Sequence, residues 1–292
     1  MQARRNIRST ARMASQLYRG VDLYADLNEK DSDYQDGSPR IRLLDLRALP
    51  ARTRDEDTDR PIEGTLRVVP LYYSPRYAAL SYVWGQKPQN GKSYTVRCGD
   101  VEIAVSKNCL DALSCICERF GELSIWVDSI CINQDDPAEL EGQLPFMGEI
   151  YSQAHTVFVW LGPENVSTDA GLEYSRRLAQ RRTLHSGWGC SEARTIQETL
   201  RHKWFQRGWT FQELIMANNL VFLTESQSLT WNDILRAKDQ LLRELPRMPS
   251  KALEDFSASV RDLVPIIDLW KSVPFSLSGY EFWTYLLIVL EV

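Results

Sequence analysis

Two short apolar runs on either side of an amphipathic segment constrain the fold more than any other feature of this chain. The first run is residues 125–127, ending at Asp128, and the second is residues 155–161, ending at Gly162. Both are apolar on both faces rather than alternating, which is typical of parallel strands covered by helices. Between them, apolar residues recur at steps of three and four, as on one helix face: Leu140, Leu144, Met147, Ile150 and Tyr151. Strand, helix and strand in this order predict a βαβ unit in an α/β protein.

Composition narrows the kind of protein. The 292 residues are 43% hydrophobic and 25% charged, which is ordinary for a soluble globular protein of one large or two small domains. The net charge of −5 argues against a nucleic-acid partner. No apolar segment resembles a signal peptide, and the last apolar run, residues 282–290, is too short to span a bilayer. We therefore expect a cytoplasmic protein with no membrane and no nucleic-acid partner.

The six cysteines show no paired C-x-x-C spacing, and the chain has only three histidines. This pattern does not fit the ligand spacings of zinc sites, so no metal is predicted. Cys109, Cys115 and Cys117 share one apolar segment. We interpret the cysteines as small buried hydrophobic residues in a reducing compartment.

Further elements follow from local patterns. Ser106 or Asn108 can cap a helix that Gly121 ends. The other expected elements are strands at 40–46, 65–71, 77–84 and 220–223, a hairpin at 93–105, and helices at 168–183, 231–245, 251–271 and 279–291. The helix at 168–183 carries four arginines, Arg176, Arg177, Arg181 and Arg182. They are interpreted as a solvated helix face, with a phosphate-binding patch as the alternative.

No nucleophile or phosphate-loop motif is present: G-x-S-x-G, the Walker loop, H-E-x-x-H and G-x-G-x-x-G are all absent from the sequence. A catalytic triad stays open, because triads assemble in space. Polar residues instead gather in three clusters, two of which directly follow expected strands. The clusters are Ser81, Tyr82, Trp84 and Gly85; Asp128, Ser129, Asn133, Gln134 and Asp135; and Arg207, Trp209, Gln212 and Glu213. Since open parallel sheets bind ligands beyond the carboxyl ends of their strands, a small-molecule ligand is predicted at that edge.

Each of these residues also has a purely structural interpretation. Asp128 would bond loop amides, and the Asn-Gln pair after it would serve turn geometry. The tryptophans would gain most by burial in the core. Glu213 would lie on a helix surface or pair with Arg207. Both interpretations stay open at this point.

Four sequence blocks, in order along the chain, resemble the fungal heterokaryon incompatibility (HET) domain. They are YAALSYVWG at 77–85, IWVDSICINQDD at 125–136, MGEIYSQAHTVFVWLG at 147–162 and RGWTFQE at 207–213. The resemblance covers roughly residues 66–235. It implies a HET domain at 65–245, an N-terminal extension with an edge strand at 1–64, and a C-terminal helical segment at 246–292. The chain departs from the family pattern at Leu140 and Leu144, where Arg and Val are usual, and at Pro145 inside the expected helix.

HET domains are in turn similar to TIR domains. This likeness implies a TIR-like (flavodoxin-like), mostly parallel sheet flanked by helices, with inserted and C-terminal helices. WTFQEL at 209–214 resembles the TIR pattern of Trp-Cys, two residues and Glu-Leu, in which the glutamate cleaves NAD. The resemblance therefore implies that Glu213 is catalytic and that NAD is a substrate, with no cofactor. A carboxylate stabilises the positive charge that develops on the ribose. Trp84 or Trp209 would stack on a base, and Arg207 would meet a phosphate.

Three functions follow from the resemblance and the composition. The first is an effector of nonself recognition and programmed cell death, with or without NAD hydrolysis. The second is a cyclase- or isomerase-type enzyme of secondary metabolism, whose nine tryptophans line an apolar pocket. The third is a non-catalytic module that associates with itself or with a partner incompatibility protein.

Overall fold

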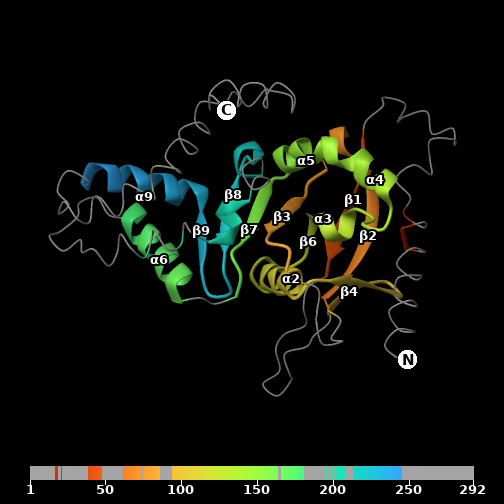
Figure 1. Cartoon of the computed structure of the whole chain (residues 1–292), viewed down its shortest axis with the longest axis horizontal. Helices are drawn as coiled ribbons and strands as arrows, with labels where there is room; N and C mark the ends of the chain where they lie inside the picture. Colours follow the sequence, from red (N-terminus) through yellow and green to blue (C-terminus); the bar gives the residue numbers. More distant parts are fainter. Residues whose placement is uncertain are drawn as a thin grey trace, which may run out of the picture. The chain divides into compact units, whose positions relative to one another are not determined.

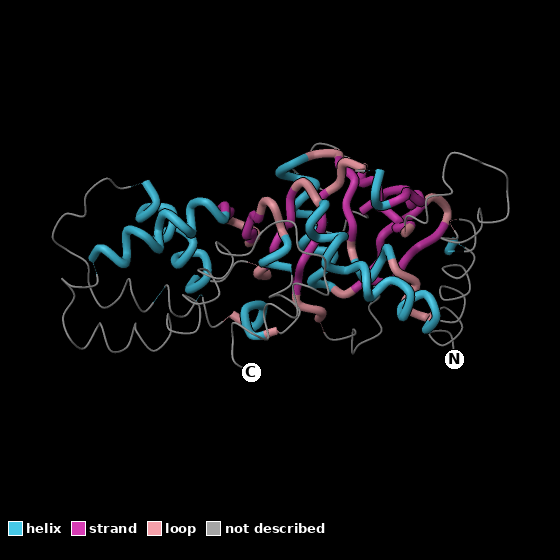
Figure 2. The backbone as a smooth tube through the Cα atoms, turned by 90° about the horizontal axis from the view of Figure 1, so that it is seen from above, coloured by secondary structure: helices cyan, strands magenta, loops and turns pink. Residues whose placement is uncertain are grey.

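The chain forms two compact units, residues 1–156 and 157–292. The computed structural model describes residues 17–18, 21, 39–47, 62–73, 75–85, 94–163, 166–180, 195, 199, 202–207 and 213–244 (Figures 1 and 2). The expected helices at 251–271 and 279–291, together with Trp209 and Gln212, lie outside these residues. Each unit is described by itself.

The described part of the N-terminal unit contains a mixed sheet in the strand order β5-β4-β2-β1-β6-β3. The strands are β1 (Arg40–Leu46), β2 (Ile62–Pro70), β3 (Ala78–Tyr82), β4 (Tyr94–Cys98), β5 (Val101–Val105) and β6 (Leu123–Trp126). Among the described strands of this unit, only β2 with β4 and β3 with β6 pair in parallel, whereas β1 is antiparallel to β2 and to β6, and β4 is antiparallel to β5. The prediction of a mostly parallel sheet is therefore wrong. A buried apolar run looks the same whichever way its neighbour runs, so the sequence pattern did not distinguish the two.

Strand β1 lies inside this sheet rather than at its edge. Its Leu44 is paired with Leu66 of β2 on one side and with Ile125 of β6 on the other. The expectation of an edge strand in residues 1–64 is thus wrong. Four apolar side chains of β1 are buried, which is why the strand needs cover on both faces: Ile41, Leu43, Leu44 and Leu46.

Short helices connect and cover these strands. They are η2 (Leu71–Tyr73), α2 (Lys107–Phe120), α3 (Asp128–Cys131), α4 (Pro137–Gln143), η3 (Leu144–Phe146) and α5 (Met147–Gln153). Ser106 caps α2 by accepting from the amide of Cys109 at 3.2 Å, and Gly121 ends it with a φ of 74°.

The single helix expected through residues 140–151 is divided into α4, η3 and α5. Pro145 stands at the start of η3, where its missing N–H interrupts α-helical bonding. Leu144 is exposed as a result, although Met147, Ile150 and Tyr151 are buried as predicted.

Helix α5 fixes β3 and β6 in the core. The hydroxyl of Tyr77 donates to the carbonyl of Ile150 at 2.6 Å, and that of Tyr151 donates to the carbonyl of Leu80 at 3.2 Å. The ring of Trp126 meets Tyr151 edge to face, with centroids 5.5 Å apart. The carboxyl ends of the two parallel strands are therefore held on a rigid base.

The C-terminal unit contains β7 (Thr156–Trp160), whose first residue closes the preceding unit, β8 (Leu220–Leu223) and β9 (Ser228–Thr230). Strand β8 runs parallel to β7 and antiparallel to β9. Helices α6 (Val166–Gln180) and α9 (Trp231–Glu244) pack on each other, and η4 (Lys203–Gln206) brings in aromatic side chains. The core contains an aromatic cluster of Trp204, Phe205, Phe222 and Trp231.

The arginines of α6 make structural contacts. Arg176 binds Glu173 at 2.5 Å and Gln227 at 2.9 Å, and it also donates to the carbonyl of Ser228; Arg177 binds Glu173 at 2.9 Å. These two side chains thus pair within the unit, whereas Arg181 and Arg182 lie outside the described residues. Within the described ranges, every helix is too short or too polar to cross a bilayer.

Candidate functional site

Polar residues converge where β3 and β6 end. Ala78 pairs with Ile125 and Ala79 with Trp126 in parallel register, so the carboxyl ends of both strands lie at one edge. Ser81 and Tyr82 finish β3, and Asp128 follows β6 after a single residue. The structure therefore brings the first two sequence clusters together.

The clearest contact in this group joins Trp84 to Asp128. The indole Nε1 donates to Asp128 Oδ2 at 2.7 Å, while the other carboxylate oxygen accepts from the amide of Ser129 at 2.7 Å. The Trp84 side chain is nevertheless 49% exposed. An exposed aromatic ring held by its polar edge presents a face on which a planar ligand can stack.

Tyr82 and Ser81 lie beneath this surface. The hydroxyl of Tyr82 donates to Ser129 Oγ at 2.8 Å, and Ser129 Oγ lies 3.8 Å from the thiol of Cys109. Burial, followed by the nearby Cys109 and Asp128, raises the pKa of Tyr82. Since Ser81 is also buried, these two residues support the site from below and do not offer a ligand surface.

Asn133 and Gln134 bond within their own loop. Asn133 Oδ1 accepts from the amide of Asp135 at 3.2 Å, and Gln134 Nε2 donates to the carbonyl of Asp128 at 2.8 Å. Their turn role is therefore confirmed. Gln134 also holds the backbone carbonyl of Asp128, so the position of this loop affects the hydrogen bond between Asp128 and Trp84.

Gly85 lies beside the first turn of α2. A Cβ there would lie 3.6 Å from that of Ser106 and 3.7 Å from that of Asn108, which is ordinary contact. Asn108 Nδ2 donates to the carbonyl of Val83 at 2.8 Å. The segment carrying Trp84 is thus tied to α2 as well as to Asp128.

The third cluster belongs to the C-terminal unit. Arg207 follows η4, and its amide donates to the carbonyl of Trp204 at 3.4 Å. Glu213 begins the helical residues 213–216 and is only 6% exposed. A carboxylate with so little exposure is a candidate for acid–base or charge-stabilising chemistry. The interpretation of Glu213 as a surface helix residue is wrong.

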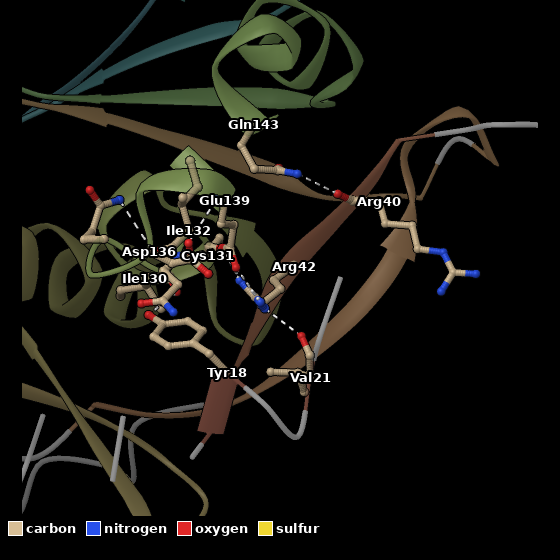
Figure 3. Close-up of polar contacts among 12 residues, drawn as sticks. Tyr18, Val21, Arg40, Arg42, Ile130, Cys131, Ile132, Asp136, Glu139 and Gln143 are labelled. Carbon is tan, nitrogen blue, oxygen red and sulfur yellow. Dashed lines mark hydrogen bonds and ion pairs between the residues drawn. The ribbon is translucent and has the colours of Figure 1, made fainter. Parts of the chain in front are cut away.

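Sequence reasoning missed a buried ion pair between β1 and α4. Arg42 is 1% exposed and Glu139 is 6% exposed, and their side chains meet through two bonds of 2.5 and 3.0 Å (Figure 3). Glu139 Oε1 also accepts from the amide of Asn133 at 2.6 Å. The only sequence signal was a charged residue inside the apolar strand IRLLDL, since Lys, Glu, Arg and Asp are almost never fully buried without a partner.

The described thiols are poor nucleophiles. All five described cysteines are buried, as expected from the sequence, and none of them is in a disulfide bond. Burial raises the pKa of Cys98, Cys109, Cys117 and Cys131 to about 12, so each is protonated at neutral pH. Among the described residues, no group of three His, Cys, Asp or Glu side chains could hold a metal ion.

The fold and the site define an α/β protein with polar loops after two neighbouring parallel strands. Residues 77–213 match the family model of the heterokaryon incompatibility protein (HET), so this region of the chain is similar to that family. No solved structure matches the chain.

Two fungal proteins are similar to this chain. The chain is 28% identical over 234 residues to heterokaryon incompatibility protein 6, OR allele, of Neurospora crassa, which covers 64% of this chain and 33% of that protein. It is 26% identical over 192 residues to vegetative incompatibility protein HET-E-1 of Podospora anserina, which covers 64% of this chain and 13% of that protein. The match thus spans a third or less of either relative.

Proposed function

We propose that this protein is a cytoplasmic effector of fungal nonself recognition whose activation leads to cell death. The observation that carries the proposal is the HET match over residues 77–213, together with two relatives that are incompatibility proteins by name. The described cysteines form no disulfide bond, which is in keeping with a reducing compartment. Self-association or a partner incompatibility protein would supply the activating signal.

The candidate ligand is a small planar molecule at the carboxyl edge of β3 and β6. Trp84 supports this part of the proposal, because its ring is half exposed while Asp128 holds its orientation. The four other described tryptophans are buried and serve the cores: Trp126, Trp160, Trp204 and Trp231. The alternative of a biosynthetic enzyme requires tryptophans that line a deep apolar pocket. These four side chains pack in the cores and do not support that alternative.

The candidate reaction is hydrolysis of NAD with Glu213 as the catalytic carboxylate. The bond between ribose C1′ and the nicotinamide nitrogen breaks, and its electron pair leaves with nicotinamide. Water then adds to C1′ and releases a proton, giving ADP-ribose. A TIR-like placement of Glu213 in the block WTFQEL and its low exposure support this assignment.

The test of the reaction is nicotinamide release from NAD by the purified protein. We expect release by the unmodified chain and a loss of about 100-fold or more in Glu213→Gln, since the amide cannot stabilise positive charge on the ribose. Glu225→Gln, an exposed position of the same unit, is the matched control and should retain activity. Absence of release by the unmodified chain would exclude NAD hydrolysis.

The test of the cellular role is expression in a fungal host. We expect growth arrest from the unmodified chain, and normal growth with Glu213→Gln if hydrolysis causes the arrest. Full arrest by Glu213→Gln would instead support the non-catalytic interaction module. Normal growth with the unmodified chain, even when it is forced to oligomerise, would contradict the effector role.

A further inference from the structure

The described residues near the N-terminus contact the candidate site loop from outside the matched family region. Tyr18 is buried, and its hydroxyl donates to the carbonyl of Ile130 at 2.8 Å. The carbonyl of Val21 accepts from Arg42 Nε at 2.7 Å. The amide of Val21 bonds the carbonyl of Leu17 at 3.1 Å, which places these residues in one helical turn. We call Leu17, Tyr18 and Val21 the N-terminal latch.

Arg42 connects the latch to the loop. Its guanidinium lies 4.8 Å from the centre of the Tyr18 ring, and its Nη1 donates to the carbonyl of Cys131 at 3.2 Å (Figure 3). Glu139 neutralises the same guanidinium and accepts from the amide of Asn133. A buried cation depends on this complete set of partners, because each unsatisfied donor carries a desolvation cost.

Three peptide groups of the loop are therefore held by side chains from other segments. Tyr18 holds the carbonyl of Ile130, Arg42 that of Cys131, and Glu139 the amide of Asn133. The same loop begins at Asp128, the residue that orients Trp84. Loss of the latch would leave Arg42 Nε without its acceptor and the guanidinium without an aromatic face, so the loop would readjust.

We infer that the N-terminal latch sets the position of the loop from Asp128 to Asp136 and thereby regulates the candidate site. When the latch is bound to the loop, Asp128 is held where it can orient Trp84. When the latch is displaced, the contact between Asp128 and Trp84 loosens. The regulatory half of this inference rests on the function proposed above. The positional half rests only on contacts within the N-terminal unit.

The test is amide hydrogen exchange of the full-length chain, read in peptides covering residues 128–139. Tyr18→Phe removes one hydroxyl and keeps the ring, so we expect exchange about fivefold faster, as for the loss of one hydrogen bond. Tyr18→Ala also removes the ring and should accelerate exchange further. Tyr94→Phe, a hydroxyl deletion on β4 of the same unit, is the control and should leave these peptides unchanged.

Growth arrest in the fungal host distinguishes the positioning of the loop by the latch from the regulation of the candidate site by the latch. Faster exchange together with altered arrest in Tyr18→Phe supports the inference in full. Exchange equal to that of Tyr94→Phe overturns the latch, and faster exchange with unaltered arrest overturns its regulatory role. If the unmodified chain does not arrest growth, the proposed function and the regulatory half both fail, while exchange alone still decides whether the latch positions the loop.

Discussion

The indole nitrogen of Trp84 and the carboxylate of Asp128 lie 2.7 Å apart and join the segments that follow two parallel strands, β3 and β6. Asp128 additionally accepts from the amide of Ser129, so one carboxylate serves two donors. Charged acceptors make stronger hydrogen bonds than neutral ones. This pair therefore determines how the exposed ring is oriented.

Asp128→Ala should lower the free energy of unfolding by about 1–2 kcal/mol, because two donors lose a charged acceptor at a partly buried position. Asp128→Asn should cost less, since the amide oxygen still accepts one bond. Urea denaturation measures both values. Asp100→Ala, in the exposed turn between β4 and β5, is the control and should fall within error of the unmodified chain. Equal stability of Asp128→Ala and Asp100→Ala would contradict the role of Asp128.

Arg42→Met should destabilise the chain by about 3–5 kcal/mol, because it leaves the carboxylate of Glu139 buried and without its cation. The double variant Arg42→Met with Glu139→Leu should recover part of this loss, since it removes the uncompensated charge as well. Recovery should be incomplete, because the amide of Asn133 also loses its acceptor. Chemical denaturation of the two single variants and the double variant gives the coupling energy. Additive losses would show that the two side chains do not interact.

Gly171→Ala should destabilise the C-terminal unit although alanine is the better helix former. A Cβ at this position would lie 1.9 Å from Thr199 Oγ1 and 2.9 Å from Thr199 Cβ. Overpacking of this kind costs about 1–3 kcal/mol, which exceeds the gain in helix propensity of about 1 kcal/mol. Thermal unfolding should show partial recovery when Thr199→Ala is added. A rise in the melting temperature of Gly171→Ala alone would contradict the close packing of α6 against Thr199.

The stability of the C-terminal unit should fall as the medium is acidified through the titration of His202. Burial lowers the pKa of His202 from its ordinary value of 6.5, partly opposed by a hydrogen bond with the Leu161 backbone. Its Nδ1 accepts from the amide of Trp204 at 3.2 Å, which requires the neutral ring. The unfolded chain then binds a proton more readily than the folded one. The stability that His202 contributes is therefore complete above the pKa of His202 in the unfolded chain. It is lost as the pH falls towards the pKa of His202 in the folded chain.

Melting temperatures at about pH 7.5 and about pH 5.5 measure this effect across the titration of an ordinary histidine. His202→Asn keeps a capping acceptor without the titration, so its melting temperature should fall less over the same range. Carboxylates contribute equally to both proteins and cancel in the comparison. If the melting temperatures of the unmodified chain and of His202→Asn fall by the same amount, His202 does not contribute to the pH dependence of stability.

Several elements could be predicted because their signals are local. The cap at Ser106, the end of α2 at Gly121, the strand β8 and the burial of the cysteines each follow from a few neighbouring residues. The turn chemistry of Asn133 and Gln134 is local in the same sense. In contrast, the division of the helix at Pro145 and the exposure of Leu144 depended on how the chain continues after the break.

The sequence by itself determined the resemblance to the HET family, because the HET blocks are contiguous runs whose residue types can be read without coordinates. It also determined that polar residues follow the apolar runs ending near Tyr82 and Val127. Only the tertiary structure decided that the sheet is mixed, that β1 lies between β2 and β6, and that Arg42 meets Glu139. Strand direction and pairings across 97 residues leave no trace in local periodicity, since they depend on which distant segments share a core.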